Sequence, residues 1–265
     1  MVDTFWALGT GCLQPVSLRK GYKIMTLVEF KNATKHFGEV IAFRDVSLAI
    51  NPGEIIALVG PNGSGKTTLL RALVGLTKLD DSSGQTVLDT VPPIGIMARK
   101  QMLYIPDDDS LIDNITALEY FGLVANLYDM PEERIDQAVS CLRQLDFDLM
   151  RLNKTLRTYS HGMRKKVQLA AMAIPNVRLI IIDEPTNGLD PTATILLREQ
   201  LTRIIAADTA LLISTHNLAF AEAVAKRVVL MKNEVLYDGP LTKLLAESKP
   251  RSLEAAYARL VLERQ

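Results

Sequence analysis

The sequence predicts an α/β protein in which a mixed, mainly parallel sheet is combined with an antiparallel β subdomain and a helical insertion. Three observations lead to this class. Short apolar runs typical of buried strands occur at 55–59, 179–182 and 210–213. Segments with apolar residues at helical spacing follow them, and the stretch from about 110 to 175 is mostly helical. With 265 residues, of which 48% are hydrophobic, the chain can bury an ordinary globular core.

Two strands are expected between residues 25 and 50, where apolar and polar residues alternate and Gly38 interrupts the pattern. Such alternation predicts a half-buried antiparallel pair. The run "EIIALVG" then predicts a buried strand, which leads into a glycine-rich loop. In "KTTLLRALVGL" the leucines recur at helical spacing, and Gly75 is placed to end that helix. Strand, loop and helix therefore follow one another directly.

Three helices are expected in the insertion at 110–175. The first begins at a capping box, in which Thr116 precedes Glu119 by three residues. Pro131 is expected to open the second helix, because proline is favoured in a first helical turn. The apolar face of this second helix consists of Ile135, Ala138, Val139, Leu142 and Leu145. The third helix follows "YSHG", and its apolar stripe consists of Val167, Ala170, Ala171 and Ile174.

The C-terminal third of the chain completes the sheet. The runs at 178–183 and 210–215 are separated by the helical pattern of 192–207, which predicts parallel strands joined by a crossover helix. The run "RVVLMKNEVLYDG" predicts a hairpin, and residues 241–265 are expected to form a helical tail.

Composition limits the partners. The 30 basic and 30 acidic residues balance, so no overall positive field draws the protein to nucleic acid, and no nucleic-acid partner is expected. Cys12 and Cys141 are too few for a disulfide framework and fit a reducing compartment. No run approaches the ~20 consecutive apolar residues that a membrane helix needs.

The N-terminus lacks the patterns of the rest of the chain. Residues 1–25 are predicted to be a loose extension, and translation starting at Met25 is an alternative. A secretory or lipoprotein signal ending near Cys12 is a further reading. Asp3 precedes the apolar patch and no positive segment does, which argues against such a signal.

The segment "GPNGSGKT", residues 60–67, has two glycines five positions apart, followed by lysine and threonine. Glycines let the backbone curl so that its N–H groups point at phosphate oxygens, and the next helix adds its positive N-terminal end. Lys66 would reach the β- and γ-phosphates, and the Thr67 hydroxyl would bind Mg²⁺. The pattern predicts a P-loop NTPase core. Its expected nucleotide contacts are Gly60, Pro61, Asn62, Gly63, Ser64, Gly65, Lys66, Thr67 and Thr68.

In "LIIIDEP" an apolar strand ends in two carboxylates. Ligands of open α/β sheets bind at the carboxyl ends of the strands, so Asp183 is expected to bind Mg²⁺ there. Glu184 is placed to orient or deprotonate the water that attacks the γ-phosphate. The alternative, a solvated turn, would leave the P-loop without the magnesium carboxylate that it requires.

With both motifs in place, the chain resembles the ATP-binding subunit of ABC transporters over roughly residues 26–240. Three further residues match motifs of that family, in the family's order: Phe37 in "KHFG", Asp190 in "NGLDP" and His216 in "STHN". The resemblance implies that Phe37 stacks on the adenine ring and that Asp190 communicates between two ATPase subunits. It also implies that His216 contacts the γ-phosphate as a second catalytic residue beside Glu184.

The segment "YSHGM" resembles the family's signature, usually written LSGGQ. In that family the signature binds the γ-phosphate of ATP held by the opposite subunit. Ser160, His161 and Gly162 are therefore expected to act on the ATP of a partner subunit. Two complete sites then need a closed head-to-tail dimer, formed by two copies of the chain or with a paralogous ATPase subunit.

The signature departs from the family at Tyr159, His161 and Met163. One reading of His161 is that its ring faces solvent and only its backbone matters. The other is that a protonated imidazole pairs with the transferred phosphate. The basic run Arg164–Lys166 is expected to be a solvated helix face, with favourable charge near the phosphate as the alternative.

A second departure lies in "YIPDDDS". Asp107 stands where the resemblance places a glutamine that senses Mg²⁺ and links the core to the helical insertion. A carboxylate could bind the metal more strongly, but it also brings negative charge toward ATP. Asp107 is expected to be a metal ligand, and Asp108 or Asp109 could substitute for it.

The resemblance implies an ATPase, with ATP and Mg²⁺, that powers a membrane transporter through a separate transmembrane permease subunit at the cytoplasmic face of the cell membrane. The tail "SLEAAYARLVLE" and the "IPDD" segment resemble the drug- and antibiotic-export branch, which favours export. Two other classes stay open: a soluble ABC ATPase that acts on ribosomes or DNA, and a nucleotide-binding regulator without turnover.

Overall fold

The computed structural model describes residues 5–6, 15–16, 26–80, 86–88, 99–108, 110–204 and 208–262. Most of the predicted N-terminal extension, including Cys12, lies outside these residues, as does Asp109. The described part of the extension is a short antiparallel pair, β1 (Phe5–Trp6) and β2 (Pro15–Val16).

An antiparallel sheet forms first along the chain, in the order β4-β3-β6. Its strands are β3 (Val28–Phe37), β4 (Val40–Ile50) and β6 (Thr86–Leu88). β3 pairs with β4 over their whole length, and Gly38 takes a φ of 58° in the turn between them. The strand pair predicted from the alternating pattern is thus confirmed.

Six strands form the larger sheet within the described residues, in the order β11-β10-β5-β9-β8-β7. They are β5 (Ile55–Val59), β7 (Met102–Ile105), β8 (Leu179–Asp183), β9 (Ala210–Thr215), β10 (Arg227–Met231) and β11 (Val235–Pro240). Five strands run parallel, and β11 pairs antiparallel with β10. The mixed, mainly parallel sheet and the C-terminal hairpin are confirmed.

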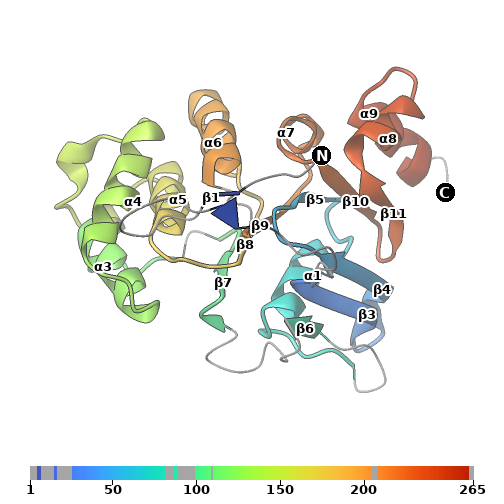
Figure 1. Cartoon of the computed structure of the whole chain (residues 1–265), viewed down its shortest axis with the longest axis horizontal. Helices are drawn as coiled ribbons and strands as arrows, with labels where there is room; N and C mark the ends of the chain where they lie inside the picture. The colour runs from blue at the N-terminus through green and yellow to red at the C-terminus, as the bar shows by residue number, and fades with distance from the viewer. Residues whose placement is uncertain are drawn as a thin grey trace.

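The α-helices are α1 (Lys66–Leu73), α3 (Ala117–Leu127), α4 (Glu133–Gln144), α5 (His161–Ala170), α6 (Pro191–Ile204), α7 (Leu218–Val224), α8 (Leu241–Ala246) and α9 (Leu253–Tyr257). A π-helix, Ala258–Leu262, continues α9. In Figure 1, α3, α4 and α5 lie at one end of the molecule and α8 and α9 at the other, with the larger sheet between them.

Local sequence explains where several helices begin and end. Thr116 and Glu119 form the predicted capping box at the start of α3. Gly75 takes a φ of 74° just after α1, a left-handed conformation that glycine adopts without strain. α4 begins at Glu133 rather than at Pro131. The backbone N–H of Arg134 donates a hydrogen bond to the carbonyl of Pro131, so Pro131 lies in a turn just ahead of the helix.

The buried core lies on both faces of the larger sheet. Ile55, Ala57 and Val59 of β5 belong to one buried cluster, while the alternate residues Ile56 and Leu58 belong to the other. The second cluster includes residues of β3, β4 and α1, and the first includes residues of α3 to α9. A parallel sheet covered on both faces explains why its strands are continuously apolar.

The helical region shares its core with the sheet. Phe121 of α3 and Leu142 of α4 are fully buried and lie in the same cluster as Val59. The helices at 110–175 are therefore packed on the α/β core through a continuous apolar contact.

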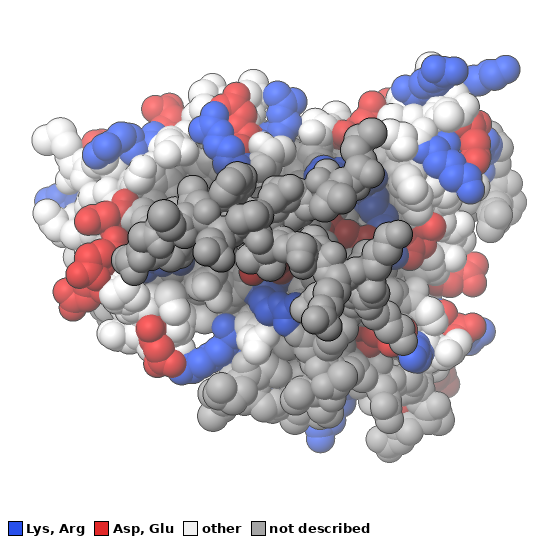
Figure 2. Space-filling view, in the orientation of Figure 1, with Lys and Arg blue, Asp and Glu red and all other residues white. Residues whose placement is uncertain are grey.

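On the face shown in Figure 2, acidic and basic side chains both occur among the described residues. No helix in the described part of the chain is long and apolar enough to cross a membrane.

Candidate nucleotide-binding site

The P-loop and the acidic pair meet at one edge of the larger sheet. The loop at 60–65 follows β5, Asp183 ends β8, and Thr215 ends β9. β9 pairs in parallel with both β5 and β8, so the carboxyl ends of the three strands lie together. A cavity of about 340 Å³ opens here, lined by Phe37, Val40, Ile41, Ala42, Asn62, Gly63, Ser64, Gly65, Lys66, Thr67, Thr68, Asp107 and Glu184.

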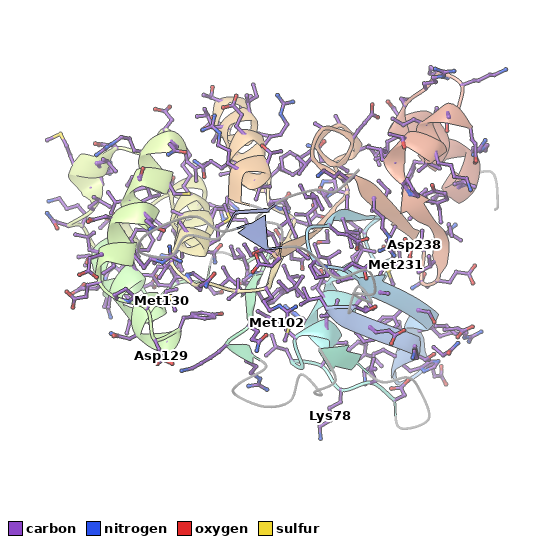
Figure 3. The ribbon with its side chains drawn as sticks, viewed as in Figure 1. Lys78, Met102, Asp129, Met130, Met231 and Asp238 are labelled. Atoms are coloured by element: carbon purple, nitrogen blue, oxygen red, sulfur yellow. The ribbon has the colours of Figure 1, made fainter. Side chains whose placement is uncertain are left out.

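Two glycines of the P-loop are required by its geometry. Gly65 takes a φ of 92°, and a Cβ there would lie 2.2 Å from the carbonyl oxygen of Ala42. A Cβ on Gly60 would lie 2.2 Å from the carbonyl oxygen of Met231, which ends β10 and is labelled in Figure 3. The loop thus packs directly on backbone from two other strands, which leaves its inner side open to the cavity.

Lys66 is buried beneath the P-loop. Its Nζ donates hydrogen bonds to the carbonyl oxygens of Gly60, at 2.8 Å, and Pro61, at 3.2 Å. The same atom lies 3.9 Å from Oε1 of Glu184. Burial lowers the pKa of Lys66, although Glu184, Asp183 and Asp107 act to raise it. Gly60 and Pro61 therefore shape the loop through the lysine rather than by lining the cavity.

Asp183 presents a carboxylate oxygen that the described residues leave unsatisfied. The residue is fully buried, and its Oδ1 accepts a hydrogen bond from the hydroxyl of Ser214 on β9. Its Oδ2 is buried without a hydrogen-bond partner within the described residues, and so is Oγ of Ser64 in the P-loop. A buried polar atom without a partner is costly, so both atoms are suited to contact a ligand. A carboxylate oxygen suits a divalent cation, and a hydroxyl suits a phosphate oxygen.

Glu184 and His216 are brought together from two strand ends. Oε2 of Glu184 lies 3.0 Å from Nδ1 of His216 and accepts a hydrogen bond of 3.3 Å from the backbone N–H of His216. The Glu184 side chain is 8% exposed, whereas that of His216 is 52% exposed. Glu184 also takes a φ of 46°, which is uncommon for a residue with a side chain and is a strain typical of functional sites.

Asp107 lies in the same cavity, half-buried. Its Oδ1 accepts a hydrogen bond of 2.8 Å from Nδ2 of Asn187. The segment after β7 is thereby tied to the loop that carries Asp190. Asp108 is exposed, and its carboxylate accepts a hydrogen bond from the backbone N–H of Ser110. Asp107 is thus the acidic residue of the described part of "IPDDDS" that lines the cavity.

Asp190 lies at the start of α6, away from the cavity. Its Oδ1 accepts a hydrogen bond of 2.8 Å from the backbone N–H of Ala193, and its Oδ2 lies 3.5 Å from Nζ of Lys166. The hydrogen bond from Ala193 is the main reason that the pKa of Asp190 is lowered, and Lys166 adds to it. The carboxylate therefore stabilises the N-terminal end of α6.

The signature residues do not line the cavity. Ser160 accepts a hydrogen bond from the backbone N–H of Met163 and so begins α5. A Cβ on Gly162 would lie 2.5 Å from the carbonyl oxygen of Gly188. The ring of His161 lies against the α-carbon side of Gly188, where a Cβ would be 2.1 Å from the imidazole. His161 is an exposed residue, but its ring rests on this loop instead of pointing freely to solvent.

Phe37 stands at the end of β3 and is 55% exposed. The ammonium group of Lys35 lies 5.2 Å from the centre of this ring, within the range of a cation–π contact. Lys35 is held in turn by Asp80, at 3.3 Å. The exposed aromatic ring lines the same cavity as the P-loop.

The prediction of a solvated face for Arg164–Lys166 was wrong. Lys165 is 0% exposed and Lys166 is 8% exposed. The guanidinium group of Arg164 donates hydrogen bonds to Asp113 and to the carbonyl oxygen of Leu156. A basic run beside apolar residues gives no sign of which carbonyl oxygens the fold brings to it, so its burial was not visible in the sequence.

Two contributors to the site were missed by sequence reasoning: Asn187 and Ser214. Asn187 was visible only as part of "NGLDP", and Ser214 only as the end of an apolar run. Each acts through a partner that is distant in the chain, which the pattern of a single segment does not reveal.

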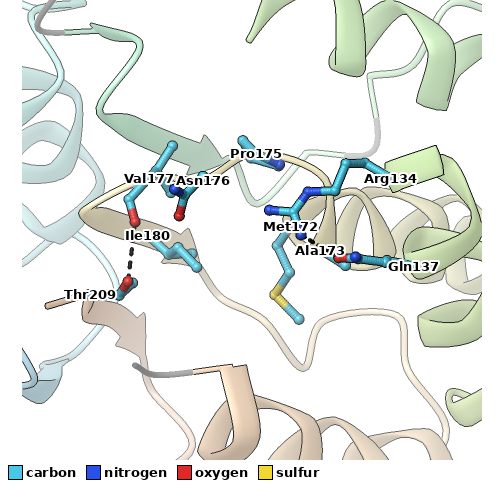
Figure 4. A pocket seen from close by; sticks show the side chains of 9 residues that line it. All are labelled: Arg134, Gln137, Met172, Ala173, Pro175, Asn176, Val177, Ile180 and Thr209. Carbon is cyan, nitrogen blue, oxygen red and sulfur yellow. Dashed lines mark hydrogen bonds between the residues drawn. The ribbon is translucent and has the colours of Figure 1, made fainter. Parts of the chain in front are cut away.

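A second cavity, of about 240 Å³, lies near the amino ends of β8 and β9, and none of the site residues described above lines it. Figure 4 shows it between Arg134 and Gln137 of α4 and the segment that leads into β8. The hydroxyl of Thr209 closes one side with a hydrogen bond of 3.2 Å to the carbonyl oxygen of Val177.

The fold and the site define a nucleotide-binding protein of the P-loop class, and known proteins narrow this class further. A family described as ABC transporter matches residues 43–187. The Nod factor export ATP-binding protein I of Cupriavidus pinatubonensis is 30% identical over 87% of this chain and 68% of its own length. The ABC transporter ATP-binding protein YhcH of Bacillus subtilis is 30% identical over 80% and 69%.

Similar solved structures come from the same family. The ATP-binding subunit of an ABC transporter superposes with a TM-score of 0.80 and 30% identity, covering 89% of this chain and 99% of that one. A dimeric ATP-binding cassette in a post-hydrolysis state, bound to ADP and phosphate, superposes with a TM-score of 0.72 and 26% identity, covering 80% and 98%. The chain belongs to the ABC transporter family, as an ATP-binding subunit.

Proposed function

We propose that this protein hydrolyses ATP in the presence of Mg²⁺ and that the energy drives a membrane transporter. The observation that carries the proposal is that one cavity brings the P-loop together with Asp107 and Glu184, above the buried Asp183. A phosphate cradle, a metal carboxylate and a base are the parts that phosphoryl transfer to water requires.

Residues 62–68 would hold the phosphates, on a loop that Gly60 and Pro61 shape from behind. Lys66 now donates to carbonyl oxygens of its own loop, and phosphate oxygens can replace these acceptors. The unpartnered Oγ of Ser64 supplies a further donor. Lys35 lies over one face of the Phe37 ring, so we assign the adenine ring to the opposite face.

Thr67, Asp183 and Asp107 would hold Mg²⁺. The orphaned Oδ2 of Asp183 fits such a ligand role, and Asp107 and Thr67 line the cavity of the P-loop. When bound, the cation would neutralise charge that develops on the phosphate oxygens.

Glu184 would orient or deprotonate the attacking water. Its carboxylate is nearly buried and its backbone is strained, which holds it at the end of β8. His216 faces Glu184 through Nδ1, which leaves Nε2 directed away from the carboxylate and available to the γ-phosphate.

The active unit would be a head-to-tail dimer. Ser160, His161 and Gly162 lie outside the cavity of their own chain, so they would act on ATP held by the opposite subunit. The hollow of about 490 Å³ between the loop at 186–191 and His216 offers a surface for the second copy, with the exposed Ile195 on its wall. Asp190 in this loop would communicate between the two sites. One of the similar solved structures is a dimer.

The role in transport is proposed from the names of similar proteins. The name of a relative at 30% identity describes export of Nod factor. We propose that this chain also serves an exporter, and that it reaches the cytoplasmic face of the membrane by binding a separate permease. The ATPase domain would span 26–240, with its helical subdomain at about 110–175, followed by the helical tail at 241–265.

Phosphate release by the purified protein tests hydrolysis, with Glu184→Gln as the comparison. Absence of phosphate release from the wild type, with ATP binding intact, would favour a nucleotide-binding regulator without turnover. Purification from membranes tests the partner. Recovery with a polytopic membrane protein supports transport. Recovery with ribosomes or DNA favours an ABC ATPase that acts on them instead of a transporter subunit.

A further inference from the structure

Lys165 is a buried charge that the proposed mechanism does not yet use. It lies on α5, is 0% exposed, and extends beneath the carboxyl ends of the sheet strands. Its Nζ donates hydrogen bonds to the carbonyl oxygens of Pro106, at 2.9 Å, Asp107, at 3.4 Å, and Asp183, at 3.5 Å. One ammonium group thus joins α5 to the ends of β7 and β8.

The segment that follows β7 is held from two directions. Lys165 binds its backbone, and Gln168, one turn further along α5, donates a hydrogen bond of 2.9 Å to the carbonyl oxygen of Asp108. From the other side, Nδ2 of Asn187 donates to the carboxylate of Asp107. These contacts fix both the main chain and the side chain of Asp107 at the wall of the cavity.

Acidic groups outnumber basic groups in this region. Asp107, Asp108, Asp183 and Glu184 all act on Lys165, and all of them except Asp108 also act on Lys66. Burial lowers the pKa of Lys165, while the nearby carboxylates, Asp107 foremost, act to raise it. A buried ammonium is costly without an opposite charge, and carbonyl oxygens alone satisfy only its hydrogen bonds. Without Lys165, the carboxylates would face the triphosphate with Lys66 as their remaining basic neighbour.

We propose that Lys165 is a positioning residue that fixes Asp107 and compensates its negative charge, so that an acidic residue can stand in a cavity that binds ATP. The inference rests on the proposed function for its ligand, and it concerns electrostatic coupling between two residues of this chain. It explains why a lysine is buried on α5 at this point.

The test is a double-mutant cycle with Lys165→Gln, Asp107→Asn and the double variant. Glutamine keeps hydrogen-bond donors but removes the charge. The first readout is equilibrium binding of ATP in EDTA, which excludes the metal and any turnover. We expect Lys165→Gln to weaken this binding by ~10-fold or more, and we expect the loss to shrink to below ~3-fold in the Asp107→Asn background. Equal losses in both backgrounds would overturn the proposal.

The second readout is thermal unfolding of the nucleotide-free full chain. We expect Lys165→Gln to lower the midpoint more when Asp107 is present than in the Asp107→Asn background. If Lys165→Gln alone does not fold, the double variant should be rescued. Failure of both to fold would show that Lys165 serves packing and hydrogen bonding without compensating Asp107.

Two controls separate charge from other effects. Lys165→Arg keeps the charge and should retain most of the metal-free ATP affinity. Lys154→Gln removes one positive charge at an exposed position of the helical region and should leave ATP affinity and the midpoint unchanged. Coupling in these assays without phosphate release by the wild type would mean that the proposed hydrolysis fails while this inference stands.

Discussion

The carboxylate of Glu184 and the imidazole of His216 meet with Oε2 and Nδ1 3.0 Å apart. They come from the ends of β8 and β9, which pair in parallel. The contact joins the two residues that we assign to catalysis, and it sets which nitrogen of the histidine remains for the γ-phosphate.

Replacing Glu184 by glutamine removes the base and keeps the shape of the side chain. General-base catalysis contributes about 10²–10⁴-fold, so phosphate release by Glu184→Gln should fall by that factor while ATP still binds. Size-exclusion chromatography with ATP should show an increased fraction of dimer. Normal turnover in this variant would remove Glu184 from the catalytic role.

Complementation tests the head-to-tail dimer. Lys66→Met disables the P-loop and Ser160→Arg disables the signature, so each protein alone should be inactive. In a 1:1 mixture, half of the dimers are mixed, and each mixed dimer contains one intact site of two. Phosphate release should recover to about a quarter of the wild-type rate. A mixture as inactive as its components would contradict a site shared between two copies of this chain.

The P-loop backbone should not tolerate a side chain at residue 65. Gly65→Ala places a Cβ 2.2 Å from the carbonyl oxygen of Ala42 at a φ of 92°. We expect weaker ATP binding and a free energy of unfolding lower by ~1–3 kcal/mol, measured by urea denaturation.

Gly122→Ala is the matched control for this change. Gly122 lies inside α3, and nothing is within 4 Å of a Cβ there. Alanine should therefore raise the free energy of unfolding by ~0.5–1 kcal/mol and leave ATP binding unchanged. Equal effects of the two substitutions would argue against the loop geometry described above.

The thiol of Cys141 should be unreactive in the folded protein. It is buried on α4, its Sγ lies 2.7 Å from Oε1 of Gln200, and burial raises its pKa to about 12. Because the thiolate is the reactive form and a raised pKa reduces it at pH 8, labelling of the Cys12→Ser variant at pH 8 should be ~100-fold or more slower than in urea. Rapid labelling of the folded protein would contradict this burial.

Many elements of the fold could be predicted because their patterns are local. The alternation before residue 50, the capping box at Thr116 and the apolar strands at 55–59 and 179–182 are each visible within a few residues. The order of the strands is not local. β5 lies between β9 and β10 in the sheet, although both of these strands come much later in the chain than β5.

The sequence by itself determined the class of the protein, because the spacing of glycines, lysine and threonine at 60–67 and the carboxylates after an apolar strand reflect requirements of phosphate chemistry. Only the tertiary structure decided which side chains support that chemistry. The contacts of Lys165 with Pro106 and of Asn187 with Asp107 join positions 59 and 80 residues apart. A buried lysine and a solvated one look alike in a sequence, because burial depends on which distant carbonyl oxygens and carboxylates the fold brings within hydrogen-bond distance.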